Sequence, residues 1–184
     1  MSYFAKPGPE NTKACLETVL KVIEERGIRD IVVASTYGDT GLIFAEALKD
    51  KDVNLVIVTH NVGFREPGTH EMTEEVRERL KKLGAKVYTG TMALRGIGSA
   101  IKSQFHYSEE TLIAQTLRIF GQGLKVCVEI VVMACDAGLI PPEDVIAVAG
   151  TARGADTVAL IKAMPSNKFF NLKVREILAK PGDW

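Results

Sequence analysis

The sequence has few cysteines, a single tryptophan and no net charge. Its 184 residues include three cysteines and one tryptophan, and 23 Lys and Arg residues are matched by 23 Asp and Glu residues. Zero net charge gives the surface no general attraction for nucleic acid or for an anionic membrane, so we expect neither as a partner. An anionic ligand must instead be held by a local site.

The cysteines and histidines argue against a disulfide framework and against a metal site. They are Cys15, Cys127, Cys135, His60, His70 and His106. An odd number of widely separated cysteines cannot pair completely, and no spacing among these residues matches a zinc motif. All three cysteines fall in segments with a helical pattern, where we interpret them as small buried apolar residues.

Long apolar runs are missing as well. The most apolar stretch, Val126–Met133, has eight residues and includes Glu129, so it is too short and too polar to span a bilayer. Residues 1–9 lack the apolar core of a signal peptide. We therefore expect a cytoplasmic protein, and the length indicates a single domain over residues 1–184.

Apolar segments of two kinds alternate along the chain. Continuous β-branched runs predict buried strands at Ile31–Ala34, Leu55–Val58, Ala85–Thr89, Val145–Ala149 and Val158–Ile161. Helical spacing predicts helices at Thr12–Arg26, Thr40–Lys49, Met72–Leu83, Glu110–Phe120, Leu124–Ala137 and Asn171–Ala179. This alternation predicts an α/β fold with three layers, in which helices cover both faces of a mostly parallel sheet.

Two further expectations concern the segment between the third strand and the long helices. The polar residues 103–110 favour a solvated surface loop, with a lid over a site as the alternative. The helices over residues 110–137 carry more apolar residues than one sheet face needs. We therefore expect them to contribute to a homo-oligomer interface.

The turn after the first predicted strand has the chemistry of an anion site. Residues 35–41 read Ser-Thr-Tyr-Gly-Asp-Thr-Gly and lead directly into a helix. The hydroxyl groups of Ser35, Thr36 and Thr40, two glycines and the N–H groups of a helix start suit a phosphate. The alternative is that Thr36 or Asp39 only caps the helix.

Three more loops follow predicted strands and are expected at the same edge of the sheet. In the second loop, Phe64 could cover a flat ring, and His60 could transfer protons or simply bond to neighbouring loops. In the fourth loop, Arg153 is the best candidate for a charge-assisted contact with an anion, and Asp156 is its expected partner. The candidate binding residues are Ser35, Thr36, Tyr37, Gly38, Asp39, Thr40, Gly41, Thr59, His60, Asn61, Phe64, Thr91, Met92, Gly150, Thr151 and Arg153.

Two common nucleotide motifs are not found. The GxxxxGK[ST] phosphate loop is absent from the sequence. The segment Gly96–Ile101 has only two of the three glycines of a dinucleotide fingerprint and does not directly follow a predicted strand. We therefore expect neither a Walker-type site nor a Rossmann NAD site.

Two segments resemble the C-terminal α/β domain of pyruvate kinase. In the first, the strand Ile31–Ala34 leads into the turn 35–41, a helix, and a strand ending at Thr59-His60-Asn61. In the second, the helix Leu124–Ala137 precedes the Val-rich strand of Asp144–Gly150. The resemblance covers about residues 12–163 and implies that Ser35, Thr36, Gly38, Thr40 and Gly41 hold a phosphate. Because 184 residues cannot include the catalytic barrel, we do not expect a complete pyruvate kinase.

The resemblance also implies a cofactor. Small stand-alone archaeal proteins of this fold look like binders of flavin mononucleotide (FMN), which would place a flat ring near Thr59–Phe64, Met92 and Arg153. An FMN-dependent oxidoreductase would fit, although the sequence shows no committed acid–base pair or nucleophile. The alternative is a non-catalytic module that senses a phosphorylated metabolite, and in either case the partner is a small phosphorylated ligand.

Overall fold

The computed structural model describes residues 2–183 as one seven-stranded sheet with helices on both faces. The strands are β1 (Ser2–Phe4), β2 (Asp30–Ala34), β3 (Asn54–Val58), β4 (Lys86–Tyr88), β5 (Asp144–Ala149), β6 (Thr157–Lys162) and β7 (Lys173–Pro181). The α-helices are α1 (Thr12–Arg26), α2 (Asp39–Leu48), α3 (Glu74–Lys82), α4 (Gly96–Phe105), α5 (Glu109–Arg118) and α6 (Gln122–Asp136). Two 3₁₀ turns, η1 (Pro9–Asn11) and η2 (Ser166–Asn171), complete the described elements.

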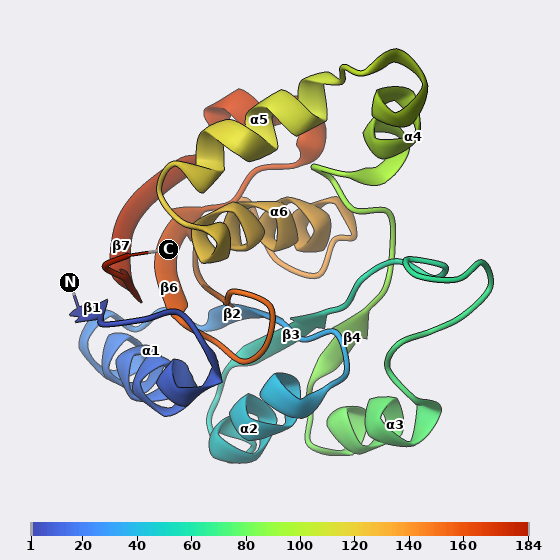
Figure 1. Ribbon diagram of the computed structural model, residues 1–184. Helices are drawn as coiled ribbons and strands as arrows, with labels where there is room; N and C mark the ends of the chain where they lie inside the picture. The colour runs from blue at the N-terminus through green and yellow to red at the C-terminus, as the bar shows by residue number, and fades with distance from the viewer. Residues whose placement is uncertain (1, 184) are drawn as a thin grey trace.

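The strand order explains where the chain changes direction. The order across the sheet is β1-β7-β6-β5-β2-β3-β4. From β2 the chain moves outward through β3 to β4, and it then returns through α4, α5 and α6 to place β5 on the other side of β2 (Figure 1). Only β6 runs against its neighbours, so the sheet is mixed but mostly parallel. The α/β fold with three layers is therefore confirmed.

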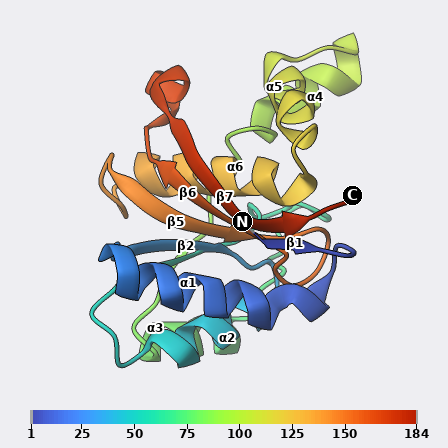
Figure 2. The same cartoon turned by 90° about the vertical axis from the view of Figure 1, so that its left-hand side faces the viewer.

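Alternating side chains of the strands form two separate cores. Ile31 and Val33 of β2 belong to the core beneath α1, α2 and α3, while Val32 between them belongs to the core beneath α6. The same alternation holds in β3 and β5. Figure 2 shows these two helical layers on opposite sides of the sheet. Burial on both faces is the reason why these strands have continuous rather than alternating apolar sequences.

Two expectations about secondary structure are wrong. The helix expected at Asn171–Ala179 is strand β7, which lies between β6 and β1. The loop expected at residues 103–110 is mostly helical, because its first three residues end α4 and Glu109 begins α5. His106 terminates α4 with a φ of 62°, and Ser108 caps α5 by accepting a hydrogen bond from the Thr111 N–H.

The three cysteines are free thiols on helices, as expected. Cys15 and Cys127 are fully buried, and burial raises the pKa of Cys15 to about 12 and that of Cys127 well above its ordinary value. Cys135 is partly buried. Across residues 2–183 no helix combines the length and the apolar character needed to cross a bilayer.

Candidate functional site

The reversal of strand order creates a crevice at the carboxyl ends of the parallel strands. The loops that follow β2 and β5 leave the sheet side by side there, which is the usual position for a ligand in an open α/β sheet. A cavity of about 290 Å³ opens at this point between the loops after β2, β3 and β5 and the inward face of α6. We refer to this cavity as the crevice.

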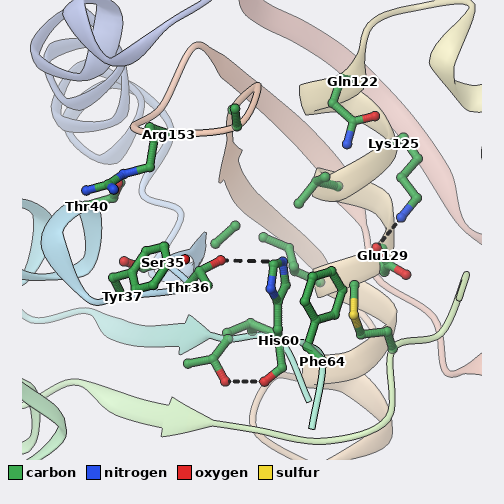
Figure 3. Close-up of a pocket in the computed structure, with 18 of the residues that line it drawn as sticks. Ser35, Thr36, Tyr37, Thr40, His60, Phe64, Gln122, Lys125, Glu129 and Arg153 are labelled. Carbon is green, nitrogen blue, oxygen red and sulfur yellow. Dashed lines mark hydrogen bonds and ion pairs between the residues drawn. The ribbon is translucent and has the colours of Figure 1, made fainter. Parts of the chain in front are cut away.

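The turn over residues 35–41 forms one side of the crevice (Figure 3). Gly38 precedes α2 with a φ of 99°, and a Cβ there would lie 2.2 Å from Val76 Cγ1 of α3, so only glycine fits. The Gly41 N–H donates to Ser35 Oγ over 3.0 Å. The helix start is thus supported by Ser35, and not by Thr36 or Asp39 as the capping alternative proposed. The side chains of Thr36 and Thr40 line the crevice.

Arg153 reaches the same turn from the loop after β5. Its guanidinium lies 2.7 Å from Asp39 Oδ2 and 5.1 Å from the centre of the Tyr37 ring. The hydrogen bond from Arg153 to Asp39 raises the pKa of the guanidinium further above its ordinary value. The Arg153 guanidinium therefore lies at the turn over residues 35–41 and is paired there with the Asp39 carboxylate.

Asp156 does not pair with Arg153, contrary to expectation. It is fully buried and accepts hydrogen bonds from the backbone N–H groups of Gly8 (3.3 Å) and Thr151 (2.9 Å). The Thr157 hydroxyl lies 2.8 Å from its other oxygen. This carboxylate fastens the loop after β5 to the N-terminal segment, so the wall of the crevice that carries Arg153 is held at its base.

His60 sits in a hydrogen-bonded chain beside the turn. Its Nδ1 lies 2.7 Å from Glu71 Oε2, and its Nε2 lies 3.4 Å from the Thr36 hydroxyl (Figure 3). A carboxylate on Nδ1 fixes the orientation of the imidazole and directs Nε2 into the crevice. His60 thus bonds to neighbouring loops, and with Nδ1 donating to Glu71 its Nε2 is the acceptor that faces the Thr36 hydroxyl. Glu71 was missed from the sequence because it lies eleven residues from His60 in an irregular loop.

Phe64 is partly buried and contacts two neighbouring side chains. It stacks on His60 with a centroid separation of 3.8 Å, and the Arg95 guanidinium lies 4.4 Å from the centre of its ring. The Phe64 side chain still lines the crevice. Further apolar walls for a flat ligand are Met92 and the residues of α6, namely Val126, Ile130 and Met133.

Helix α6 contributes polar groups that the sequence analysis did not single out as a site. Lys125 and Glu129 are 4% and 1% exposed and form a close ion pair on the wall of the crevice. Glu129 also accepts a hydrogen bond of 2.9 Å from the Leu94 N–H. Burial lowers the pKa of Lys125, and the attraction of Glu129 opposes that effect. Their spacing of four residues within an otherwise apolar helix was the available signal, because buried charges are rare unless paired.

Most of the expected binding residues meet in the crevice. Those that line it are Ser35, Thr36, Tyr37, Asp39, Thr40, Thr59, His60, Phe64, Met92, Gly150 and Arg153. Asn61 and Thr91 line a neighbouring surface depression instead. Gly38 and Gly41 shape the turn behind the cavity, and Thr151 binds Asp156 through its backbone. Lining residues that were not expected include Arg95, Arg118, Gln122, Lys125 and Glu129.

The donor set of the crevice suits an anionic organic molecule and not a metal ion. No group of three or more His, Cys, Asp or Glu side chains within residues 2–183 is arranged to hold a metal. Four cationic side chains (Arg95, Arg118, Lys125 and Arg153) line the cavity, against two lining carboxylates, Asp39 and Glu129. A scan of the chain against models of known protein families finds no match.

Proposed function

We propose that the crevice binds FMN, with the flavin phosphate at the turn over residues 35–41. This proposal is supported by one feature of the crevice, namely that two different sets of polar groups lie on opposite sides of it. Hydroxyl groups and a helix start lie on one side, and Gln122 and Lys125 of α6 lie on the other (Figure 3). Apolar side chains of α6 line the wall between them. These three surfaces, taken in this order, suit the three parts of FMN: its phosphate, its flat ring and the polar edge of that ring.

The residues present fit each part of the cofactor. Thr36, Thr40 and the N–H groups that begin α2 would hold the phosphate. Met92 and Ile130 would contact the ring, and Gln122 and Lys125 would donate hydrogen bonds to its carbonyl edge. When bound, FMN supplies the capacity to accept and return a hydride, which no protein side chain offers. His60, oriented by Glu71 through Nδ1, would accept a hydrogen bond or a proton at Nε2 beside the bound molecule.

The resemblance to the C-terminal domain of pyruvate kinase supports the same position for the phosphate. The strand, turn and helix that carry the resemblance are β2, the 35–41 turn and α2, and the turn lines the crevice. We propose on this basis that the fold is related to that domain, and that the protein acts without a kinase barrel.

A second candidate function is a sensor for a smaller phosphorylated metabolite. The observation in its favour is the size of the crevice, about 290 Å³, which lies at the lower end of the roughly 300–1,000 Å³ typical of ligand pockets. The Lys125–Glu129 pair would then bond to sugar hydroxyls. Thermal stabilisation by sugar phosphates in the absence of flavin uptake would favour this alternative.

The proposal is tested by titrating the protein with FMN and with riboflavin, which lacks the phosphate, and following flavin fluorescence. Thr40→Val keeps the shape of the side chain but removes the hydroxyl from the turn. A hydrogen bond to a charged group contributes about 1.5–3 kcal/mol, so we expect FMN to bind about 10-fold or more weakly to the variant. Riboflavin should bind both proteins equally.

The matched control is Thr18→Val on α1, where the hydroxyl bonds to the Ala14 carbonyl outside the crevice. It should leave both flavins unaffected. Failure of the wild-type protein to take up FMN would refute the cofactor assignment. Equal weakening of FMN and riboflavin by Thr40→Val would refute the position of the phosphate.

A further inference from the structure

A second cavity opens between α4, α5 and α6, behind the crevice. It has a volume of about 230 Å³ and is defined by Leu94, Arg95, Ser99, Lys102, Thr111, Ala114, Gln115, Arg118 and Lys125. We call it the α4–α5 cavity. Residues of α4 and α5 line it. These two helices lie on the side of α6 that faces away from the sheet (Figures 1 and 2). The volume accommodates a phosphate or a small carboxylate.

The lining of the α4–α5 cavity is basic. Four cationic side chains, Arg95, Lys102, Arg118 and Lys125, are joined by the hydroxyls of Ser99 and Thr111 and the amide of Gln115. No acidic side chain from residues 2–183 is among its lining residues. The nearby carboxylate of Glu110 is directed at α4, because a Cβ added to Gly98 would lie 2.2 Å from its Oε2.

These cations are close enough to repel one another. The charges of Arg118 and Arg95 both lower the pKa of Lys125, in addition to its burial. Glu129 compensates Lys125, Arg95 lies over the Phe64 ring, and Arg118 donates to the Gln122 side chain over 2.6 Å. Four cations line the cavity, while two carboxylates lie nearby, Glu129 paired with Lys125 and Glu110 against α4, so an excess of positive charge remains that favours an anion.

The α4–α5 cavity is next to the crevice. Arg95, Arg118 and Lys125 line both spaces, so an anion in the α4–α5 cavity and a ligand in the crevice would share these three side chains. The remaining polar residues, Ser99, Lys102, Thr111 and Gln115, belong to α4 and α5 and do not line the crevice. The two helices thus add a compartment that the turn after β2 does not reach.

We propose that the α4–α5 cavity binds a second anionic group, a phosphate or a carboxylate, next to the ligand in the crevice. The anion is held by charge-assisted hydrogen bonds from Lys102, Arg95 and Arg118 and by the Gln115 amide. This inference rests on the proposed function for the identity of the first ligand. It assigns the protein a substrate that carries phosphate or carboxylate groups and binds beside the flavin.

The test is calorimetric titration of FMN-saturated protein at about 0.15 M ionic strength, where charges more than about 8 Å apart are screened, with inorganic phosphate in one arm and succinate in the other. The informative variants are Lys102→Glu, which reverses a lining charge, and Gln115→Glu, which adds a carboxylate with almost no change of shape. We expect the wild-type protein to bind at least one of the two anions, and each variant to weaken that binding by about 10-fold or more. FMN affinity should change less than about 2-fold, since neither residue lines the crevice.

Matched controls separate a site from a general change in charge. Gln104→Glu places the same charge on α4 outside the cavity, and Lys51→Glu makes the same reversal in the turn before β3. Binding of neither anion would overturn the inference, as would an equal loss in the controls. If FMN itself does not bind, the ligand-free protein should bind phosphate at two sites per chain. Lys102→Glu then removes one of them and Thr40→Val weakens the other, so the two proposals fail separately.

Discussion

Lys125 and Glu129 form an ion pair almost entirely removed from water. Desolvation of two charges is costly, and the remaining oxygen of Glu129 is satisfied by the Leu94 N–H. The pair therefore connects α6 to the segment that precedes α4. It also keeps an ammonium group at the boundary between the crevice and the α4–α5 cavity.

Removal of one partner should be far more harmful than removal of both charges. We expect Lys125→Met to lower the free energy of unfolding by about 3–5 kcal/mol, because Glu129 is left as an unpaired buried carboxylate. The double variant Lys125→Met/Glu129→Gln should recover most of that loss, since the amide oxygen can still accept from Leu94. Urea unfolding monitored by circular dichroism measures both values. A double variant as unstable as the single one would contradict this account.

At the scale of single elements, the start of α6 depends on one close approach. A Cβ on Gly123 would lie 2.0 Å from Thr157 Oγ1 and 2.6 Å from Thr157 Cβ at the start of β6. The absence of a side chain therefore lets α6 lie close against the sheet. This contact also sets the height of Gln122 and Lys125 above the strands.

We predict that Gly123→Ala destabilises the protein although alanine is the better helix former. Overpacking costs about 1–3 kcal/mol, which exceeds the gain in helix propensity of about 0.5–1 kcal/mol. Thermal unfolding should therefore show a lower midpoint. Gly182→Ala is the control, because the nearest atom to its added Cβ would lie 3.6 Å away. An unchanged midpoint for Gly123→Ala would show that α6 can shift freely.

The pattern of apolar residues correctly predicted the elements whose local preference matches their position in the fold. Strands β2, β3 and β5 are buried on both faces, so their apolar residues are continuous and recognisable. The sequence of β7, Lys-Val-Arg-Glu-Ile-Leu-Ala-Lys-Pro, contains good helix formers and has an exposed first half. Pairing with β6 and β1 overrides that local preference, and no local pattern reports a pairing partner.

The candidate site shows the same limit. The loops after β2, β3 and β5 were predictable, because parallel strands end at one edge of the sheet. Arg95 and Arg118 were not, since each reaches the crevice from outside these loops, at the start of α4 and the end of α5. Glu71 was not predictable either, because it acts through His60 from an irregular loop. The partner of Arg153 was missed for a related reason: Asp39 is 114 residues away, and Asp156, which is nearer in sequence, is buried in a different hydrogen-bond network.

At the scale of the whole molecule, the α4–α5 segment is unusually apolar on its outer surface. Six large side chains between residues 96 and 120 are each more than half exposed: Ile97, Phe105, Tyr107, Leu112, Ile119 and Phe120. Large apolar side chains that remain exposed along one segment indicate a surface for contact with a partner.

We predict that this segment joins two copies of the chain. Zero net charge means that identical chains have no overall repulsion to overcome. Light scattering after size exclusion should give at least a dimer for the wild-type protein. Phe105→Asp and Ile119→Asp should shift it toward the monomer. Ile43→Asp on α2, on the opposite face, should not, and a monomeric wild-type protein would refute the prediction.

The two outer strands restrict how such an assembly can be built. Both β1 and β4 are three residues long. Because β1 pairs only with Ala179–Pro181, residues 173–178 of β7 form the rest of the edge on that side. Lys173, Arg175 and Glu176 are exposed there, and charged side chains on an edge strand oppose the addition of a further strand. An assembly of this chain is therefore expected to form through its helical surface and not by extension of the sheet.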